Sequence, residues 1–250
     1  GDWNWQFNSP SFVYGEMCYS RNRLYILGAC YDTLTIDTIH LGSINSQYSQ
    51  ILTSWDTLGI IIWVRNSIDA NTFDGTLSVD LDGNSYVMNS FQAPWIRFDA
   101  DTVFAEGNTG GYIMKYDVNG NLVWINSIEV GQPFSPKCSA IDNDNNLLFA
   151  GRFRDSLIFG GFNLTSNSNY SLFVARYDTS GLCIGSRQVD WAECNSIVYS
   201  NSHNIYLTGG FSNTANFGSI SQSSYGSSDI FLANLNAITG LGGGERLTQD

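Results

Sequence analysis

Apolar and polar residues alternate in short runs along most of the chain, and residues typical of turns separate the runs. In the clearest example, residues 112–124, two alternating runs flank a turn at Asp117-Val-Asn-Gly120. Alternation with a period of two indicates half-buried β-strands, and Asp, Asn and Gly supply the positive φ angles of hairpin turns. No window shows the i, i+3, i+4, i+7 spacing of an amphipathic helix. The pattern therefore predicts an all-β protein.

The hairpin at residues 112–124 is one copy of an internal repeat. Each full copy contains an aromatic residue followed by Asp, at Trp55-Asp56, Tyr116-Asp117 and Tyr177-Asp178. Successive copies are 61 positions apart (116 minus 55, and 177 minus 116). A weaker fourth copy starts at Ile230. A fixed period of this size is typical of repeat architectures.

A second element recurs in the same phase as the hairpin. It is a short strand that follows a polar turn and closes, in the four copies, with Gly28, Asn89, Gly151 and Gly209. Another short strand precedes each turn. A connection rich in Ser, Asn and Gly follows, with one apolar anchor in each copy, at Ile36, Phe98, Phe159 and Phe217. Each unit therefore reads strand A, turn, strand B, irregular connection, strand C, Gly turn and strand D.

One four-stranded sheet cannot bury both of its faces alone, whereas sheets stacked around an axis bury them against their neighbours. We therefore predict a single β-propeller domain over residues 1–250, with a sandwich or a solenoid as the competing architectures. Its four antiparallel blades, of about 60 residues each, are expected at approximately 11–69, 75–130, 137–190 and 194–248.

The first residues of the chain look like a fourth strand without its blade. In segment 2–9, Trp5 matches Trp63 and Trp124 of two D strands, and the last unit is too rich in Gly for a firm D strand of its own. We expect segment 2–9 to complete the last blade and so hide two sheet edges. The alternative is that the chain forms part of a larger propeller.

Composition and charge narrow the function classes. The formal net charge is −12, and charged residues make up 14% of the chain against a usual share of about 25%. Such a surface repels nucleic acid and anionic membranes, and no apolar run is long enough for a membrane helix. The five cysteines lie in apolar runs and lack a Cys-x-x-Cys pair, so we expect buried thiols, with one disulfide as the alternative.

Two stretches of the repeat resemble a known family. Residues 116–124 read Tyr-Asp-x-x-Gly-Asn-Leu-x-Trp, and residues 204–211 read Asn-Ile-Tyr-Leu-Thr-Gly-Gly-Phe. This pattern resembles the bacterial seven-bladed β-propeller repeat of secreted and cell-surface proteins. The resemblance implies an extracellular or cell-surface setting, often as one module of a larger adhesive or substrate-binding protein. The family motif is structural and carries no catalytic residues to this chain.

No motif marks a catalytic, cofactor or metal site. The two histidines, His40 and His203, stand in a connection and a turn without a triad motif beside them. The acidic turns at Asp80, Asp117 and Asp142 resemble the start of a calcium loop. They lack the Glu that such a loop needs at position 12, where Phe91, Ile128 and Phe153 stand. We interpret them as hairpin turns and expect no catalytic residue, no cofactor and no metal.

Aromatic residues outside the strand registers are the candidates for ligand contact. Trp3, Trp95 and Trp191 fall off the repeated core position, and the loops of a propeller commonly carry the ligand site. Trp95, Trp191, Tyr170 and Tyr225 are the residues that we expect in ligand-contact loops.

The predicted function is that of a non-enzymatic binding or scaffold module that mediates protein–protein interaction. Its partner would be another protein, in a larger surface assembly or in the rest of its own parent chain. The alternative is a lectin-like propeller that binds a glycan through loop aromatics. A third hypothesis, a hydrolase or a lyase, would require carboxylates or histidines clustered at one axial mouth.

Overall fold

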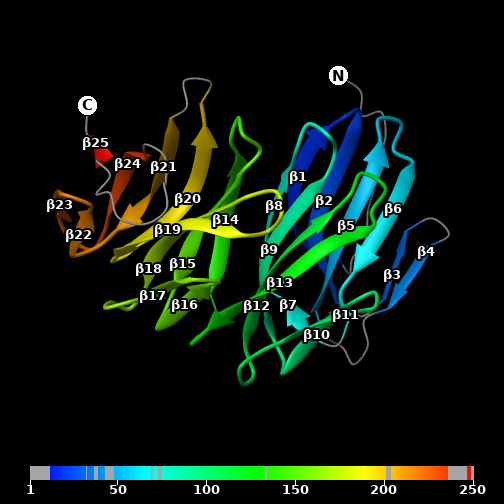
Figure 1. Ribbon diagram of the computed structural model, residues 1–250, viewed down its shortest axis with the longest axis horizontal. Helices are drawn as coiled ribbons and strands as arrows, with labels where there is room; N and C mark the ends of the chain where they lie inside the picture. The colour runs from blue at the N-terminus through cyan, green and yellow to red at the C-terminus, as the bar shows by residue number, and fades with distance from the viewer. Residues whose placement is uncertain are drawn as a thin grey trace. The chain divides into compact units, whose positions relative to one another are not determined.

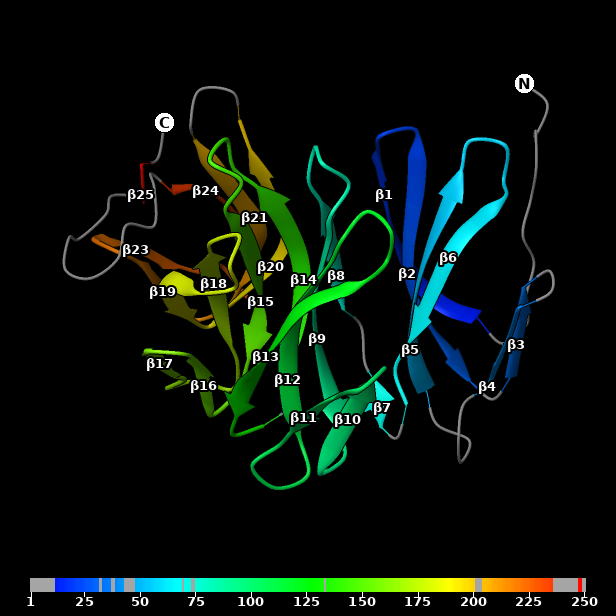
Figure 2. The ribbon, with the colours of Figure 1, turned by 45° about the vertical axis from the view of Figure 1, so that its right-hand side comes forward.

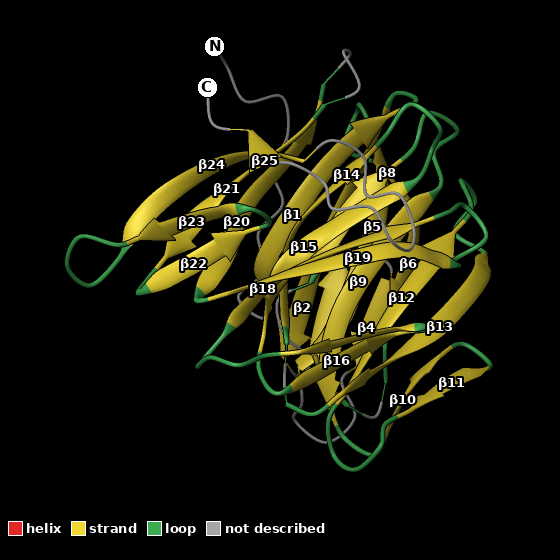
Figure 3. Ribbon diagram, turned by 60° about the vertical axis from the view of Figure 1, so that its left-hand side comes forward, coloured by secondary structure: helices red, strands yellow, loops and turns green. Residues whose placement is uncertain are grey.

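The computed structural model describes residues 12–31, 33–36, 39–42, 48–68, 70–72, 75–132, 134–200, 204–235 and 247–248. Every regular element in this part of the chain is a β-strand (Figure 3). Among the described residues there is accordingly no helix of the length and apolarity needed to cross a membrane. The chain divides into two compact units, unit 1 (Gly1–Ser127) and unit 2 (Ile128–Asp250).

Unit 1 contains the first repeat and most of the second, whose last strand extends past Ser127 to Val130. The first is a four-stranded antiparallel sheet in the order β1-β2-β5-β6 (Figure 1). Its strands are β1 (Phe12–Ser20), β2 (Arg23–Tyr31), β5 (Tyr48–Asp56) and β6 (Ile61–Asn66). The second repeat has the same strand order, with β8 (Thr76–Val79), β9 (Ser85–Gln92), β12 (Gly110–Tyr116) and β13 (Leu122–Val130). A short strand, β7 (Asn71–Thr72), also pairs with β9.

Unit 2 contains the other two repeats (Figure 2). The third is the sheet β14-β15-β18-β19, with strands Ser135–Ile141, Leu147–Phe153, Ser171–Tyr177 and Cys183–Asp190. The fourth is the sheet β20-β21-β24-β25, with strands Ala192–Tyr199, Ile205–Phe211, Asp229–Leu235 and Leu247–Thr248. In the described residues, β25 pairs with β24 only at Asn234 and Leu235.

The connection between the second and third strand of each repeat is a hairpin, so the prediction of an irregular connection is wrong. The four hairpins are β3–β4 (Thr33–Ile36, Ile39–Gly42), β10–β11 (Trp95–Phe98, Asp101–Phe104), β16–β17 (Ser156–Phe159, Phe162–Thr165) and β22–β23 (Thr214–Phe217, Ile220–Ser223). Each predicted anchor ends the first strand of its hairpin. After the anchors Phe98, Phe159 and Phe217, the next residue (Asp99, Gly160 and Gly218) has a positive φ and permits a two-residue turn.

The apolar faces of the sheets form the cores of the two units. In unit 1, Tyr25, Trp63, Phe91, Phe98 and Tyr112 belong to one buried cluster. In unit 2, one cluster extends over the third and fourth repeats and includes Leu148, Val174, Leu207, Phe217 and Phe231. Buried side chains alternate with half-buried ones along β21 and with more exposed ones along β24, as the pleat of a strand requires.

The acidic turns are hairpin turns whose Asp side chain holds the backbone. In the turn after β12, Asp117 accepts the backbone N–H groups of Asn119 and Asn121 at 2.9 and 2.8 Å. Asp142 makes the same pair of contacts in the turn after β14. The carboxylate therefore substitutes for backbone acceptors inside a tight loop, which fixes the reversal of the chain.

The all-β class and its repeated antiparallel sheets are confirmed. The predicted closing strand, residues 2–9, lies outside the described residues. A closed ring of four blades, a larger propeller and the extent of a single domain remain predictions.

Candidate functional site

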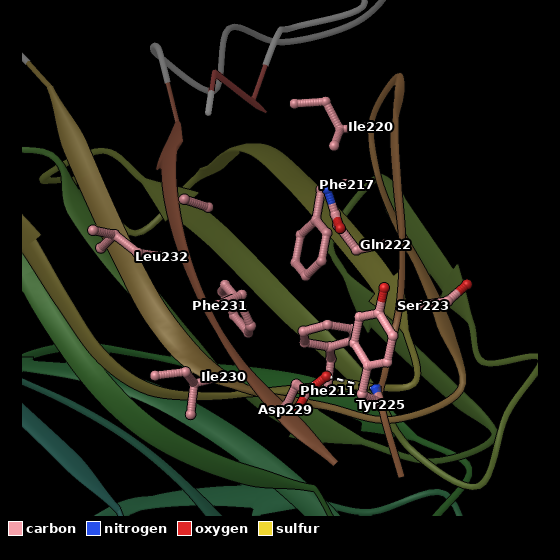
Figure 4. Close-up of a pocket in the computed structure, with 11 residues that line it drawn as sticks. Phe211, Phe217, Ile220, Gln222, Ser223, Tyr225, Asp229, Ile230, Phe231 and Leu232 are labelled. Atoms are coloured by element: carbon pink, nitrogen blue, oxygen red, sulfur yellow. Dashed lines mark hydrogen bonds between the residues drawn. The ribbon is translucent and has the colours of Figure 1, made fainter. Parts of the chain in front are cut away.

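A hollow in unit 2 is the strongest candidate for a ligand site. It lies between the β22–β23 hairpin and β24 and has a volume of about 400 Å³ (Figure 4). Its lining is formed by Phe211, Phe217, Ile220, Gln222, Ser223, Tyr225, Asp229, Ile230, Phe231, Leu232 and Ala233. We call it the β22–β24 groove. A concave surface with apolar walls and a few polar groups is the usual form of a small-molecule site.

Three buried phenylalanines form the floor of the groove. The rings of Phe217 and Phe231 lie 4.8 Å apart at an interplanar angle of 46°. The ring of Phe211 meets Phe217 edge to face at 6.1 Å. Phe231 points into the groove because alternate residues of β24 face opposite sides, which leaves Ile230 and Leu232 directed away from the aromatic cluster (Figure 4). This packing makes the floor apolar.

The rim of the groove combines one exposed aromatic ring with polar side chains. Tyr225 is 93% exposed, in the loop between β23 and β24. Its backbone N–H donates to the Asp229 carboxylate at 2.7 Å, which ties the two ends of that loop together. Ser223 and Thr214 share a hydroxyl hydrogen bond of 2.9 Å across the hairpin. The Tyr225 ring is thus presented to solvent from a loop whose backbone is held.

Two other predicted contact residues, Tyr170 and Trp191, lie together in unit 2 beside the groove. The backbone N–H of Trp191 donates to the Tyr170 carbonyl at 3.1 Å. The Trp191 carbonyl accepts the N–H of Ser212 at 2.8 Å, and Ser212 also shares a hydroxyl hydrogen bond of 3.2 Å with Tyr170. Ser212 follows Phe211 of the groove floor, but neither aromatic residue lines the groove. Both side chains are half-buried. Through Ser212, the Trp191 backbone and the Tyr170 hydroxyl are linked to the residue that follows Phe211.

Trp95 belongs to the other unit. It begins β10 in unit 1, where it pairs with Phe104, and its side chain is 37% exposed. The structure therefore places one of the four predicted contact residues, Tyr225, in the groove and two beside it. Trp3 lies outside the described residues.

The residues considered for catalysis and metal binding do not form a cluster in the described part of the chain. His40 belongs to β4, opposite Thr35, and His203 lies outside the described residues. Among the described residues, no three His, Cys, Asp or Glu side chains lie close enough together to hold a metal ion.

Sequence reasoning missed the polar members of the groove, Gln222, Ser223 and Asp229. Phe217 was predicted only as an anchor of the fold, although it also forms the groove floor. Only one feature of the sequence pointed toward the groove, and it did so weakly. Tyr225 lies in a run of Ser and Gly between two predicted strands, which indicates an exposed loop but says nothing about the hairpin that faces it.

Comparisons with known proteins give a structural similarity but no sequence match. A scan against models of known protein families finds no match, and a search of curated proteins finds no relative. Among solved structures, the chain is similar to a thermostable family-43 glycoside hydrolase. The TM-score is 0.44 at 14% sequence identity, and the match covers 96% of this chain and 77% of that chain. At this level of similarity, no residue role and no activity carries over.

The prediction of a non-enzymatic protein-binding or scaffold module is corrected at this point: the similar structure is a glycoside hydrolase, so the comparison gives that prediction no support. The prediction depended on the absence of a recognisable motif in the sequence. Residues that act together in an enzyme are often far apart along the chain, so their absence from any short motif does not exclude catalysis. The non-enzymatic assignment and the adhesive role attached to it are therefore withdrawn.

Proposed function

We propose that the β22–β24 groove binds a neutral saccharide. The observation that carries this proposal is the exposed Tyr225 ring next to the polar groups of Gln222, Ser223 and Asp229. A sugar ring has apolar C–H faces that can stack on an aromatic ring and hydroxyl groups that can donate and accept hydrogen bonds at its edge. The groove offers both kinds of contact within one hollow of about 400 Å³.

The charge of the chain supports a neutral ligand over an anionic one. The formal net charge is −12, and the groove itself contributes the Asp229 carboxylate. An acidic saccharide would be repelled by both, whereas a neutral saccharide carries no charge for them to repel. Asp229 can accept hydrogen bonds from sugar hydroxyls while it holds the Tyr225 loop, because a carboxylate has several acceptor positions.

A glycan array with the full chain tests the proposal, followed by titration calorimetry with any neutral glycan that binds. Replacing Tyr225→Ala should weaken binding about three- to tenfold, the range expected for the loss of one aromatic contact. Tyr225→Phe should retain most of the affinity because it keeps the ring. Tyr19→Ala is a matched control, since Tyr19 is also an exposed tyrosine (61%) but lies in β1 of unit 1.

The proposal fails if no neutral glycan binds, or if Tyr225→Ala and Gln222→Ala leave the affinity of a bound glycan unchanged. Any glycan that binds should also be incubated with the chain and analysed for shorter products. That measurement determines whether the bound saccharide is cleaved, which is a separate question from binding.

A further inference from the structure

We propose that Cys138 and Cys194 form a disulfide bond that joins the first strands of the third and fourth repeats. This inference is independent of the saccharide proposal. Cys138 belongs to β14 and Cys194 to β20, and the two residues are 56 positions apart in the chain. The two strands lie side by side in unit 2 (Figures 1 and 2).

The geometry of the two sulfur atoms carries the proposal. The Sγ atoms are 2.8 Å apart, within about 1 Å of the bonded S–S distance of about 2.0 Å. Each sulfur is closer to the other than to its own carbonyl partner. The Cys138 Sγ lies 3.9 Å from the Ala150 oxygen, and the Cys194 Sγ lies 3.5 Å from the Ser196 oxygen. The side chains therefore point at one another.

The surrounding backbone determines that orientation. Each cysteine lies at a β-bulge in the first strand of its repeat, and each bulge is opposite a glycine. A Cβ on Gly151 would come within 2.2 Å of the Ser135 oxygen, and one on Gly209 within 1.9 Å of the Glu193 oxygen. The two bulged strands therefore approach their neighbours as closely as glycine allows, and the cysteines are set into the common core.

Once formed, the disulfide bond would be shielded from reductants in the solvent. Cys138 and Cys194 are 9% and 1% exposed, inside the buried cluster of unit 2. The reaction breaks two S–H bonds and forms one S–S bond. Two electrons and two protons pass to a small-molecule disulfide, such as oxidised glutathione, which is reduced to two thiols. An oxidising extracellular setting, which the resemblance to secreted propeller repeats implies, would supply such an oxidant.

Two of the other three cysteines, Cys18 and Cys183, provide internal controls. Burial raises the pKa of Cys18 to about 11, with a further contribution from the charge of Glu16. Burial also raises the pKa of Cys183 to about 11. These two thiols stay protonated at neutral pH and are poor nucleophiles for disulfide exchange. We therefore expect them to remain reduced under conditions that link Cys138 to Cys194.

Tryptic peptide mapping tests the assignment, because cleavage after Lys and Arg places every cysteine in a different peptide. Cys138 falls in peptide 138–152 and Cys194 in peptide 188–246, while peptides 1–21, 24–65 and 177–187 hold the others. The full chain is refolded with oxidised and reduced glutathione, alkylated without reduction, digested and analysed by mass spectrometry. We expect peptides 138–152 and 188–246 to be cross-linked, and the cross-link to vanish after reduction.

Two variants keep the test decisive. Cys183→Ser should retain the cross-link, and Cys138→Ser should remove it and leave Cys194 alkylated. Native circular dichroism of each variant shows whether it has folded. The proposal is overturned if both cysteines of the folded wild-type chain are alkylated after oxidation. A cross-link from either cysteine to Cys18, Cys30 or Cys183 would overturn it equally.

Discussion

The first strand of a repeat is built differently in the second and the fourth repeats. In the fourth, β20 runs unbroken along β21 with a single bulge opposite Gly209. In the second, the corresponding edge of β9 is paired by two short strands, β8 opposite residues 85–88 and β7 opposite Phe91 and Gln92. Among the residues that the structure describes, none of β7 or β8 pairs opposite Asn89 and Ser90.

The residue at position 89 explains the difference. Asn89 occupies the repeat position that Gly209 holds in the fourth repeat. A Cβ on Gly75, in the gap between β7 and β8, would lie 2.8 Å from the Asn89 side chain. An asparagine at this position therefore takes the space through which the first strand would pass. Glycine leaves that space to the backbone.

The Asn89 side chain belongs to a buried hydrogen-bond network in unit 1. Its amide donates to the Gln50 side-chain oxygen at 3.2 Å, and the Tyr112 hydroxyl donates to the same oxygen at 2.6 Å. All three side chains are buried. The comparison teaches that one repeat position can serve either a close backbone approach or a buried hydrogen-bond network, but not both.

The largest expected effect on the free energy of unfolding comes from the proposed bond between Cys138 and Cys194 in the two bulged strands. Closing a loop between residues 56 positions apart should stabilise unit 2 by about 4 kcal/mol in the chain-entropy estimate. Urea unfolding of the oxidised and reduced chain, monitored by near-ultraviolet circular dichroism, measures this difference. The Cys138→Ala/Cys194→Ala variant should unfold alike under both conditions. Equal stability of the two wild-type forms, with the bond verified, would contradict the prediction.

The glycine opposite the bulge should be the next most sensitive position. Gly209→Ala would place a Cβ 1.9 Å from a backbone oxygen, so we expect a loss of about 3 kcal/mol in the free energy of unfolding. Gly210→Ala is the matched control, because its nearest neighbour would be 3.8 Å away and a change within about 1 kcal/mol is expected. Similar urea midpoints for the two variants would refute the close-approach argument.

Loss of its buried polar network should destabilise the second repeat. Asn89→Ala removes one of the two donors to Gln50, at an expected loss of about 1–3 kcal/mol in the free energy of unfolding. Tyr112→Phe removes the other donor, and the two changes should not be additive because they share one acceptor. A double-mutant cycle measures the coupling. Additive losses would show that the network does not act as a unit.

The smallest expected effect on stability comes from the turns between the third and fourth strands of the second and third repeats. These turns are built in the same way, around Asp117 and Asp178. Burial alone would raise the pKa of Asp117, but hydrogen bonds from the Asn121 side chain and from the backbone of Asn121 and Asn119 outweigh it and lower the pKa. The pKa of Asp178 is lowered in the same way by Ser180 and Leu182.

A carboxyl group with a lowered folded-state pKa stabilises the fold above its unfolded pKa, about 3.9 for Asp, and that contribution is lost as the pH falls through the folded value. Stability should therefore decline modestly below about pH 4. The Asp117→Asn/Asp178→Asn variant keeps acceptors in both turns but removes the titration, so the slope of stability against pH should be shallower. An unchanged slope in acid unfolding experiments would contradict this account.

The sequence by itself determined the features that depend on neighbours in the chain. Alternation and turn residues predicted the strands of the repeated sheets, and the Asp of each turn binds backbone groups two and four positions away. The apolar anchors Phe98, Phe159 and Phe217 were also recognised, and all three are buried. Local hydrogen bonding and the two-residue period of a strand leave a direct trace in the order of the residues.

Only the tertiary structure decided the features that join distant segments. The hairpins after the second strands, the pairing of both β7 and β8 with β9, and the contact between Cys138 and Cys194 each require a particular packing of sheets. The groove likewise combines Tyr225 with Phe211 across a hairpin. Alternation predicts that a side chain leaves one face of a strand, but the sheet that meets that face is set by the packing of the whole unit.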